Sequence, residues 1–87
     1  MAGYRLVIKK SAAKELEQVE PRTVRRRLVA AIEALGVDPR PAACEKLAGA
    51  AEAYRIRQGD YRAVYAIDDK MRVVIVVKLG HRREVYR

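Results

Sequence analysis

The residues best suited to chemistry in this sequence are three arginines that flank a predicted tight turn. Arg55, Arg57 and Arg62 lie on either side of the dipeptide Gly59-Asp60. A glycine at the first loop position is typical of a two-residue β-hairpin, and such a loop fixes the strand register. Arg57 is then expected opposite Arg62. Because like charges across a ladder cost stability, the pair predicts a bound anion, and guanidinium groups suit phosphate. A solvated basic face is the alternative.

The same register assigns the hairpin side chains to two faces. The expected facing pairs are Gln58 with Tyr61, Arg57 with Arg62, Ile56 with Ala63, and Tyr54 with Tyr65. Side chains alternate between faces along a strand, so Tyr54, Ile56, Ala63 and Tyr65 are expected to share one face. The three arginines share the other.

Composition predicts a folded, basic protein. The 87 residues allow one domain, residues 1–87, and 51% of them are hydrophobic and 34% charged. The net charge of +8 favours polyanionic partners, and residues 54–87 carry nine Lys/Arg against four Asp/Glu. No apolar run is long enough for a bilayer and the N-terminus lacks a secretory pattern. Cys44 alone gives no disulfide framework or metal cluster, so we expect a cytoplasmic protein without a cofactor.

The elements expected before the hairpin are a strand and two helices. Residues 4–9 alternate like a strand, and Ser11 is the expected N-cap of a helix that ends near Val19. A second helix is expected from Pro21, with an apolar stripe that runs to Leu35 and a stop at Gly36.

The rest of the chain predicts a loop and a last strand. Residues 37–53 are predicted as a loop with one turn near Cys44–Leu47. Residues 71–79 follow as a strand, and the run 73–77 is typical of a central strand covered on both faces. The order predicts an α+β fold: an N-terminal strand, a two-helix hairpin and a three-stranded antiparallel meander, with the helices packed on one face of the sheet.

A second group of polar side chains follows the last predicted strand. Gly80 ends that strand, and His81, Arg82, Arg83 and Tyr86 come after it. From the topology, these side chains are expected to reach the face that carries the three arginines. A lone histidine is more often structural than catalytic, and terminal arginines are commonly solvated. By themselves these residues do not define a site.

Hairpin and tail together make the sequence resemble the RelE family of toxins from type II toxin–antitoxin systems. The most specific matches are Tyr-Arg-Ile-Arg-x-Gly-Asp-Tyr-Arg at residues 54–62 and Gly-His-Arg-Arg-Glu-Val-Tyr at residues 80–86. The opening strand, Ser11–Leu16 and Lys46-Leu47 also match, so the resemblance covers nearly the whole chain. It implies a ribosome-dependent mRNA endonuclease that cuts codons in the A site, leaving a cyclic phosphate and a free 5′ hydroxyl. It also implies an acidic, RelB-like antitoxin that wraps and silences the toxin in a hetero-oligomer.

The resemblance places functional residues on the hairpin and the tail. Basic hairpin residues, a tail arginine and a tail tyrosine of the family fall on Arg55, Arg57, Arg62, Arg82 and Tyr86. Two features depart from the family pattern. Arg55 and Arg57 stand where lysines are common, and a guanidinium does not deprotonate to act as a base. The segment after Gly80 is also shorter than is usual in the family. Arg82 and Arg83 are therefore both candidates for the arginine near the leaving oxygen.

The expected chemistry is RNA cleavage by the 2′-OH group. Arg57, Arg62 and Arg82 would stabilise the phosphate as its charge grows. His81 or Tyr86 would move the protons, because an imidazole suits neutral pH and arginines nearby can lower the pKa of a phenol. Three further residues are assigned to RNA binding: Arg55, Arg83 and Tyr61.

Two other function classes stay open from the sequence. A ParE-like toxin would share the fold but inhibit DNA gyrase without cleaving RNA. A plain binding module would dock an acidic antitoxin or rRNA without catalysis. For the nuclease, the expected partners are the cognate acidic antitoxin, mRNA on the ribosome and 16S rRNA, with no membrane.

Overall fold

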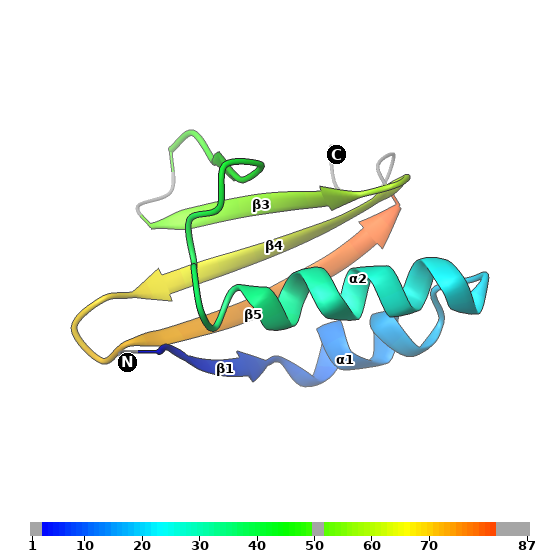
Figure 1. Cartoon of the computed structure of the whole chain (residues 1–87), viewed down its shortest axis with the longest axis horizontal. Helices are drawn as coiled ribbons and strands as arrows, with labels where there is room; N and C mark the ends of the chain where they lie inside the picture. Colours follow the sequence, from blue (N-terminus) through cyan, green and yellow to red (C-terminus); the bar gives the residue numbers. More distant parts are fainter. Residues whose placement is uncertain (1–2, 50–51, 82–87) are drawn as a thin grey trace.

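The computed structural model describes residues 3–49 and 52–81, which form a five-stranded sheet with two helices on one face (Figure 1). The strand order is β1-β5-β4-β3-β2. Strand β1 runs parallel to β5, and the other neighbours are antiparallel. The predicted α+β fold, with its opening strand, helix pair and antiparallel meander, is confirmed. Within the described part of the chain, every helix is too short or too polar to span a membrane.

The two helices follow the first strand directly. Helix α1 spans Lys10–Glu17 and helix α2 spans Arg22–Ala34. The predicted N-cap at Ser11 is wrong, because the cap position is Lys9 and makes no side-chain cap hydrogen bond. The Lys9 N–H instead donates to the Val76 carbonyl at 2.9 Å. Pairing with the sheet therefore continues up to the first helical residue and sets where the helix begins.

The hydrophobic core fills the space between the helices and the sheet. Its members come from both helices, from the turns that follow them and from alternate strand positions: Ala12, Val19, Leu28, Ile32, Leu35, Tyr54, Ile56, Ala63, Tyr65, Ile67, Val74, Val76 and Leu79. The predicted inward face of the hairpin is confirmed. Removing this apolar surface from water is the main force that holds the helices on the sheet.

The hairpin at the centre of the sequence analysis forms as predicted. Strands β3 (Ala53–Gln58) and β4 (Tyr61–Asp68) are joined by two residues, and Gly59 has a φ of +63° that glycine adopts without strain. All four predicted pairs occur, including Arg57 opposite Arg62. The arginine side chains therefore lie on the face of the sheet that carries no helix.

Strand β5 (Val73–His81) is the central strand, between β4 and β1 (Arg5–Ile8). The expected coverage of both faces of this strand is wrong. Because the helices cover one face only, Ile75 is half-buried and Lys78 exposed on the other face.

A β-bulge interrupts the pairing of β5 with β4. Val64 faces Lys78, whereas its neighbour Tyr65 faces Val76. Val77 is thus left without an opposite residue. An extra residue of this kind exchanges the faces of every side chain beyond it. The bulge therefore decides which face the end of β5 presents.

The predicted turn near Cys44–Leu47 is wrong, because this segment contains a short edge strand. Strand β2 (Glu45–Lys46) pairs antiparallel with β3 and places Glu45 opposite Arg55. The Leu47 N–H closes the connection by donating to the Ala53 carbonyl at 2.9 Å.

An ion-pair network ties the 37–49 connection to the end of the sheet away from the hairpin turn. The Arg40 guanidinium donates to Glu52 at 2.7 Å, to Asp69 at 2.8 Å and to the Tyr54 hydroxyl at 3.0 Å. The Tyr4 hydroxyl donates to the same Asp69 carboxylate at 2.6 Å. Each charge in this network has an opposite charge in direct contact.

Candidate functional site

A groove of about 470 Å³ lies on the helix-free face of the sheet, at the hairpin end. We call it the arginine groove; it is lined by Ala42, Ala43, Cys44, Glu45, Arg57 and Arg62. One wall comes from the connection that leads into β2, and the other from the facing arginines of β3 and β4. The fold thus brings Arg57 and Arg62 together.

The two facing arginines have different surroundings. Arg62 is only 4% exposed, and one of its guanidinium nitrogens donates to the Gly59 and Tyr61 carbonyls at 3.4 and 3.3 Å. Arg57 is exposed at the rim. The alternative of a solvated basic face therefore does not describe Arg62. A largely desolvated charge interacts strongly with an anion, because less water screens it.

Arg55 pairs with a carboxylate that the sequence analysis did not select. Its guanidinium donates to Glu45 Oε1 at 2.6 Å. This hydrogen bond and the charge of Arg55 lower the pKa of the Glu45 carboxyl, and the charges of Arg62 and Arg57 add to the effect. Glu45 is therefore an ionised acceptor at the edge of an otherwise cationic groove. Only its pairing with Arg55 identifies it, and that pairing depends on strand β2.

The arrangement suits a phosphodiester with a proton acceptor beside it. Guanidinium groups from two adjacent strands can donate to the oxygens of one phosphate. A carboxylate can accept a proton from a hydroxyl held near that phosphate. Among the described residues, no group of three His, Cys, Asp or Glu side chains could hold a metal ion.

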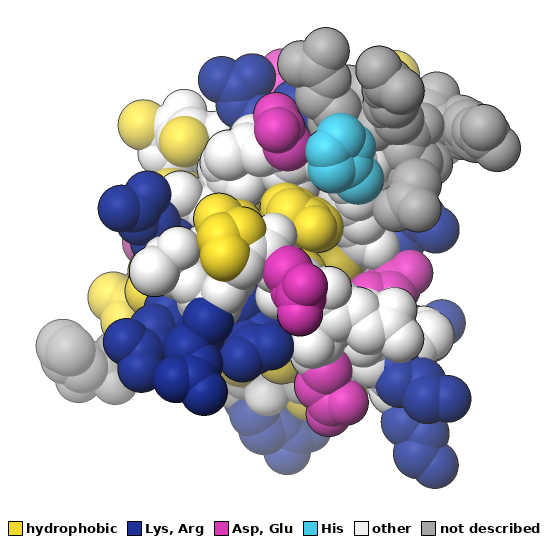
Figure 2. Space-filling model, turned by 90° about the vertical axis from the view of Figure 1, so that its right-hand side faces the viewer, with side chains coloured by type: hydrophobic (Ala, Val, Ile, Leu, Met, Phe, Trp, Pro, Cys, Tyr) yellow, Lys and Arg dark blue, Asp and Glu magenta, His cyan; other side chains and the backbone are white. Residues whose placement is uncertain are grey.

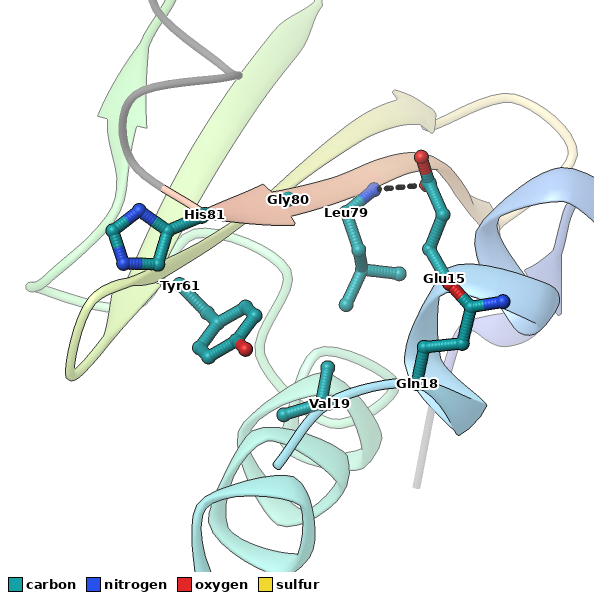
Figure 3. A pocket seen from close by; sticks show the side chains of 7 residues that line it. All are labelled: Glu15, Gln18, Val19, Tyr61, Leu79, Gly80 and His81. Carbon is teal, nitrogen blue, oxygen red and sulfur yellow. Dashed lines mark hydrogen bonds between the residues drawn. The ribbon is translucent and has the colours of Figure 1, made fainter. Parts of the chain in front are cut away.

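A second pocket, of about 290 Å³, lies on the opposite side of the sheet (Figure 3). We call it the helix-side pocket; it is lined by Glu15, Gln18, Val19, Tyr61, Leu79, Gly80 and His81. The Leu79 N–H donates to Glu15 Oε1 at 2.9 Å. Viewed from the hairpin end, the histidine lies beside exposed hydrophobic side chains, with acidic side chains close by (Figure 2).

His81 and Tyr61 belong to this second pocket, so the expected meeting of His81 with the arginine face does not occur. Tyr61 faces His81 across the β4–β5 ladder, and their rings make an edge contact with centroids 5.7 Å apart. Arg62, the next residue along β4, points to the other face. The bulge is the physical reason, because without it His81 would fall on the arginine side.

The remaining predicted site residues lie outside the described part of the chain. Arg82, Arg83 and Tyr86 follow His81, the last described residue. Their assignments stay predictions. The described site thus consists of the arginine groove with Arg55 at its edge and, on the reverse face, the helix-side pocket.

Sequence comparison identifies the family of this chain. The model for the ParE toxin of the type II toxin-antitoxin system, parDE, matches residues 6–86. A comparison with curated proteins gives no significant match.

Solved structures of RelE toxins share the fold. A chain of the archaeal RelE–RelB complex from Pyrococcus horikoshii is 33% identical with a TM-score of 0.81, over 94% of this chain and 97% of that one. A doubly substituted E. coli RelE toxin in the free state is 33% identical with a TM-score of 0.78, over 97% and 90%. A chain of the intact E. coli RelBE toxin–antitoxin complex is 34% identical with a TM-score of 0.74, over 90% and 95%. This chain therefore belongs to the RelE/ParE superfamily and is a toxin of a type II toxin–antitoxin system, RelE-like in structure.

Proposed function

We propose that this toxin is a ribosome-dependent endoribonuclease that cuts mRNA codons in the A site and so inhibits translation. The observation that carries the proposal is the facing pair Arg57 and Arg62, with Arg62 buried at the wall of a groove. Two adjacent positive charges on one face are an arrangement that an anionic substrate stabilises. The likeness to RelE toxins supports RNA as that substrate.

The proposed reaction is an internal transesterification of RNA. The 2′ oxygen attacks the adjacent phosphorus, the bond to the 5′ oxygen of the next nucleotide breaks, and a 2′,3′-cyclic phosphate and a 5′ hydroxyl result. Negative charge grows on the non-bridging oxygens as the phosphorus becomes pentavalent. Arg57 and Arg62 would stabilise that charge, because their donors are already in position. The ribosome would supply the orientation of the 2′-OH group.

The proton leaving the 2′-OH needs an acceptor near the groove. We assign this role to Glu45, whose carboxylate is ionised and lies beside both arginines. The lowered pKa makes it a weak base, and its nearness and fixed position by Arg55 compensate in part. The proton that the 5′ oxygen gains would come from Tyr86, with Arg82 or Arg83 stabilising the leaving group. We assign no proton transfer to His81, because its ring lies against Tyr61 on the opposite face of the sheet.

The proposed partners are RNA and an acidic protein. The matched structures include RelE–RelB and RelBE complexes, which supports a RelB-like antitoxin for this chain. Its acidic side chains would neutralise part of the +8 net charge, so salt should weaken the complex. We propose mRNA and 16S rRNA as the nucleic-acid partners, and the cytoplasm, where ribosomes work, as the site of action.

Mapping transcript 3′ ends after a brief pulse of expression tests the proposal. Cuts in phase with codons, absent from cells that express Arg62→Ala at the same level, are the expected result. Gyrase-dependent DNA damage without such cuts would replace the proposal with ParE-like action. Translation arrest with intact transcripts would indicate binding without catalysis.

A further inference from the structure

The bulge in β5 that places His81 away from the arginine face places Lys78 on it. Val77 is the extra residue, and Lys78 follows it directly. By alternation from the buried Val76, Lys78 would otherwise fall on the side of the hydrophobic core. Instead it faces Val64 and is exposed on the helix-free face of the sheet. The bulge therefore adds a lysine to the face that carries the paired arginines.

Lys78 and Arg62 are diagonal neighbours on that face. Strands β4 and β5 lie side by side (Figure 1), and Arg62 faces Gly80, two residues after Lys78. Diagonal neighbours in such a ladder are about 7–8 Å apart, within reach of long side chains. This separation is similar to the spacing of consecutive phosphates along an extended RNA strand. Gly80 contributes no side chain to the position directly beside Arg62, which leaves room for the RNA backbone to approach.

Lys78 and Arg55 differ in their carboxylate partners. The two side chains lie on either side of Val64, in one row across β3, β4 and β5. Arg55 donates to Glu45 at 2.6 Å, so its charge is balanced within the protein. Within residues 3–49 and 52–81, no carboxylate forms an ion pair with Lys78. An exposed ammonium group of this kind is suited to bind a phosphate as a point charge.

We infer that Lys78 binds the phosphate next to the one held by Arg57 and Arg62, and so fixes the path of the RNA strand across the helix-free face. The inference rests on the proposed function for RNA as the ligand, whereas binding at Lys78 does not require cleavage. Lys78 is a positioning residue: it holds the neighbouring phosphate while the arginines act on the cleaved one. Because a phosphate contact carries no sequence information, its effect should be the same on every codon.

Binding can be measured without the reaction on ribosomes whose mRNA carries a 2′-deoxy nucleotide at the cut. Lys78→Met should weaken toxin binding about fivefold, as for the loss of one exposed ion pair. The slope of log affinity against log salt concentration should become shallower by about 0.7, the value for one phosphate contact on a single strand. Lys78→Arg should restore both values. Unchanged affinity and slope in Lys78→Met would overturn the inference.

Lys70→Met is the matched control for this measurement. Lys70 is also exposed, but it lies in the turn between β4 and β5, at the end of the sheet away from the arginine groove. Its substitution removes the same charge and should leave affinity and slope unchanged. Equal effects of the two lysine substitutions would reduce the role of Lys78 to net charge and overturn the inference.

Neutral methylphosphonate groups identify the phosphate that Lys78 contacts. They replace, one at a time, the two phosphates on either side of the cleaved one. One of these replacements should weaken binding of the wild-type toxin about fivefold, and Lys78→Met should no longer respond to it. An undiminished response in Lys78→Met would overturn the inference, as would an effect of this variant on the affinity for an acidic antitoxin alone.

The same experiments separate this inference from the proposed function. The full Lys78 effect on binding, seen with a toxin that cuts no codon, would refute the nuclease alone. Codon cleavage by a toxin whose binding does not depend on Lys78 would refute the inference alone.

Discussion

Both ends of the sheet carry arginines, but the charges around those arginines are balanced differently. At one end, Arg40 contacts two carboxylates and a phenol hydroxyl, all supplied by the chain itself. At the other, Arg57 and Arg62 face each other, and Glu45 is the one carboxylate among the described residues that line the arginine groove. In the first cluster, the charge of Arg40 is balanced by carboxylates of the same protein. Among the described residues that line the arginine groove, two arginines stand against one carboxylate.

This difference separates Arg40, which holds the fold together, from Arg62, for which we propose a role in the reaction. The Arg40 side chain is 38% exposed, yet the hydrogen bonds described above all join it to other groups of the same protein. Arg62 is almost fully buried, yet it lines a groove. A surplus of positive charge held in a concave site is stabilised by an anion from outside. We therefore expect substitutions at the two ends to affect different measurements.

The largest effect should come from Arg62→Ala. We expect single-turnover cleavage on ribosomes to fall about 1,000-fold, as when a preorganised donor to a growing negative charge is removed. Binding to ribosomes should change far less. Circular dichroism checks that the variant folds. Arg62→Lys restores the positive charge without the forked N–H donors of a guanidinium group. Equal losses of cleavage and binding would reassign Arg62 to docking.

Glu45→Gln sharpens the role of the one carboxylate in the arginine groove. We expect cleavage to fall about 100-fold, because the acceptor for the 2′ proton is lost. RNA binding should become tighter, since the substitution removes a negative charge beside three arginines. A single-turnover assay with an independent binding measurement separates the two effects. Faster cleavage by the variant would mean that Glu45 only competes with the substrate phosphate.

His81→Gln tests whether the reverse face takes part in the reaction. Because the His81 ring faces Tyr61 and not the arginines, the cleavage rate at neutral pH should stay close to that of the wild type. The pH profile of cleavage should also keep its shape. A loss of about 100-fold would restore His81 to proton transfer and require the strand end to rearrange on the ribosome.

Arg40→Ala is the matched substitution at the structural end. The melting temperature should fall by a few degrees, because the connection before β2 loses its contacts with Glu52 and Asp69. Cleavage per folded molecule should be unchanged. Thermal unfolding gives the melting temperature. A cleavage assay normalised by active-site titration gives the rate per folded molecule. A strong loss of cleavage at unchanged stability would mean that the network also serves the arginine groove.

The smallest effect concerns acid stability. Hydrogen bonds from Arg40 and Tyr4 lower the pKa of Asp69 from 3.8 to about 2. A carboxyl whose pKa is lower in the folded state stabilises the fold above its ordinary pKa, and that contribution disappears as pH falls from about 4 to about 2. Asp69→Asn should flatten the pH dependence of the melting temperature in this range. An unchanged slope would assign acid unfolding to other carboxylates.

The hairpin could be predicted because the residues that determine its pairing are close together in the sequence. Gly59-Asp60 fixes the loop length, and the loop length fixes which residues face each other, so the facing of Arg57 and Arg62 follows from sequence alone. The inward positions of Tyr54 and Tyr65 follow from alternation in the same way.

The face of His81 was not predictable because it depends on a bulge. Val77 looks like any other member of an apolar run, yet as the extra residue it exchanges the faces of everything after it. Strand β2 was missed for a similar reason. Two charged residues carry no strand pattern, and Glu45–Lys46 pairs only because the edge of β3 is available.

The central claim is that the paired guanidinium groups stabilise the phosphate as it is cleaved. Replacing one non-bridging oxygen of the target phosphate with sulfur tests it, because sulfur is a poorer hydrogen-bond acceptor. Single-turnover cleavage of such a codon on purified ribosomes should be much slower than that of the natural codon for wild-type toxin. With Arg62→Ala the two codons should be cut at nearly the same, low rate. An undiminished sulfur effect in Arg62→Ala would contradict the claim.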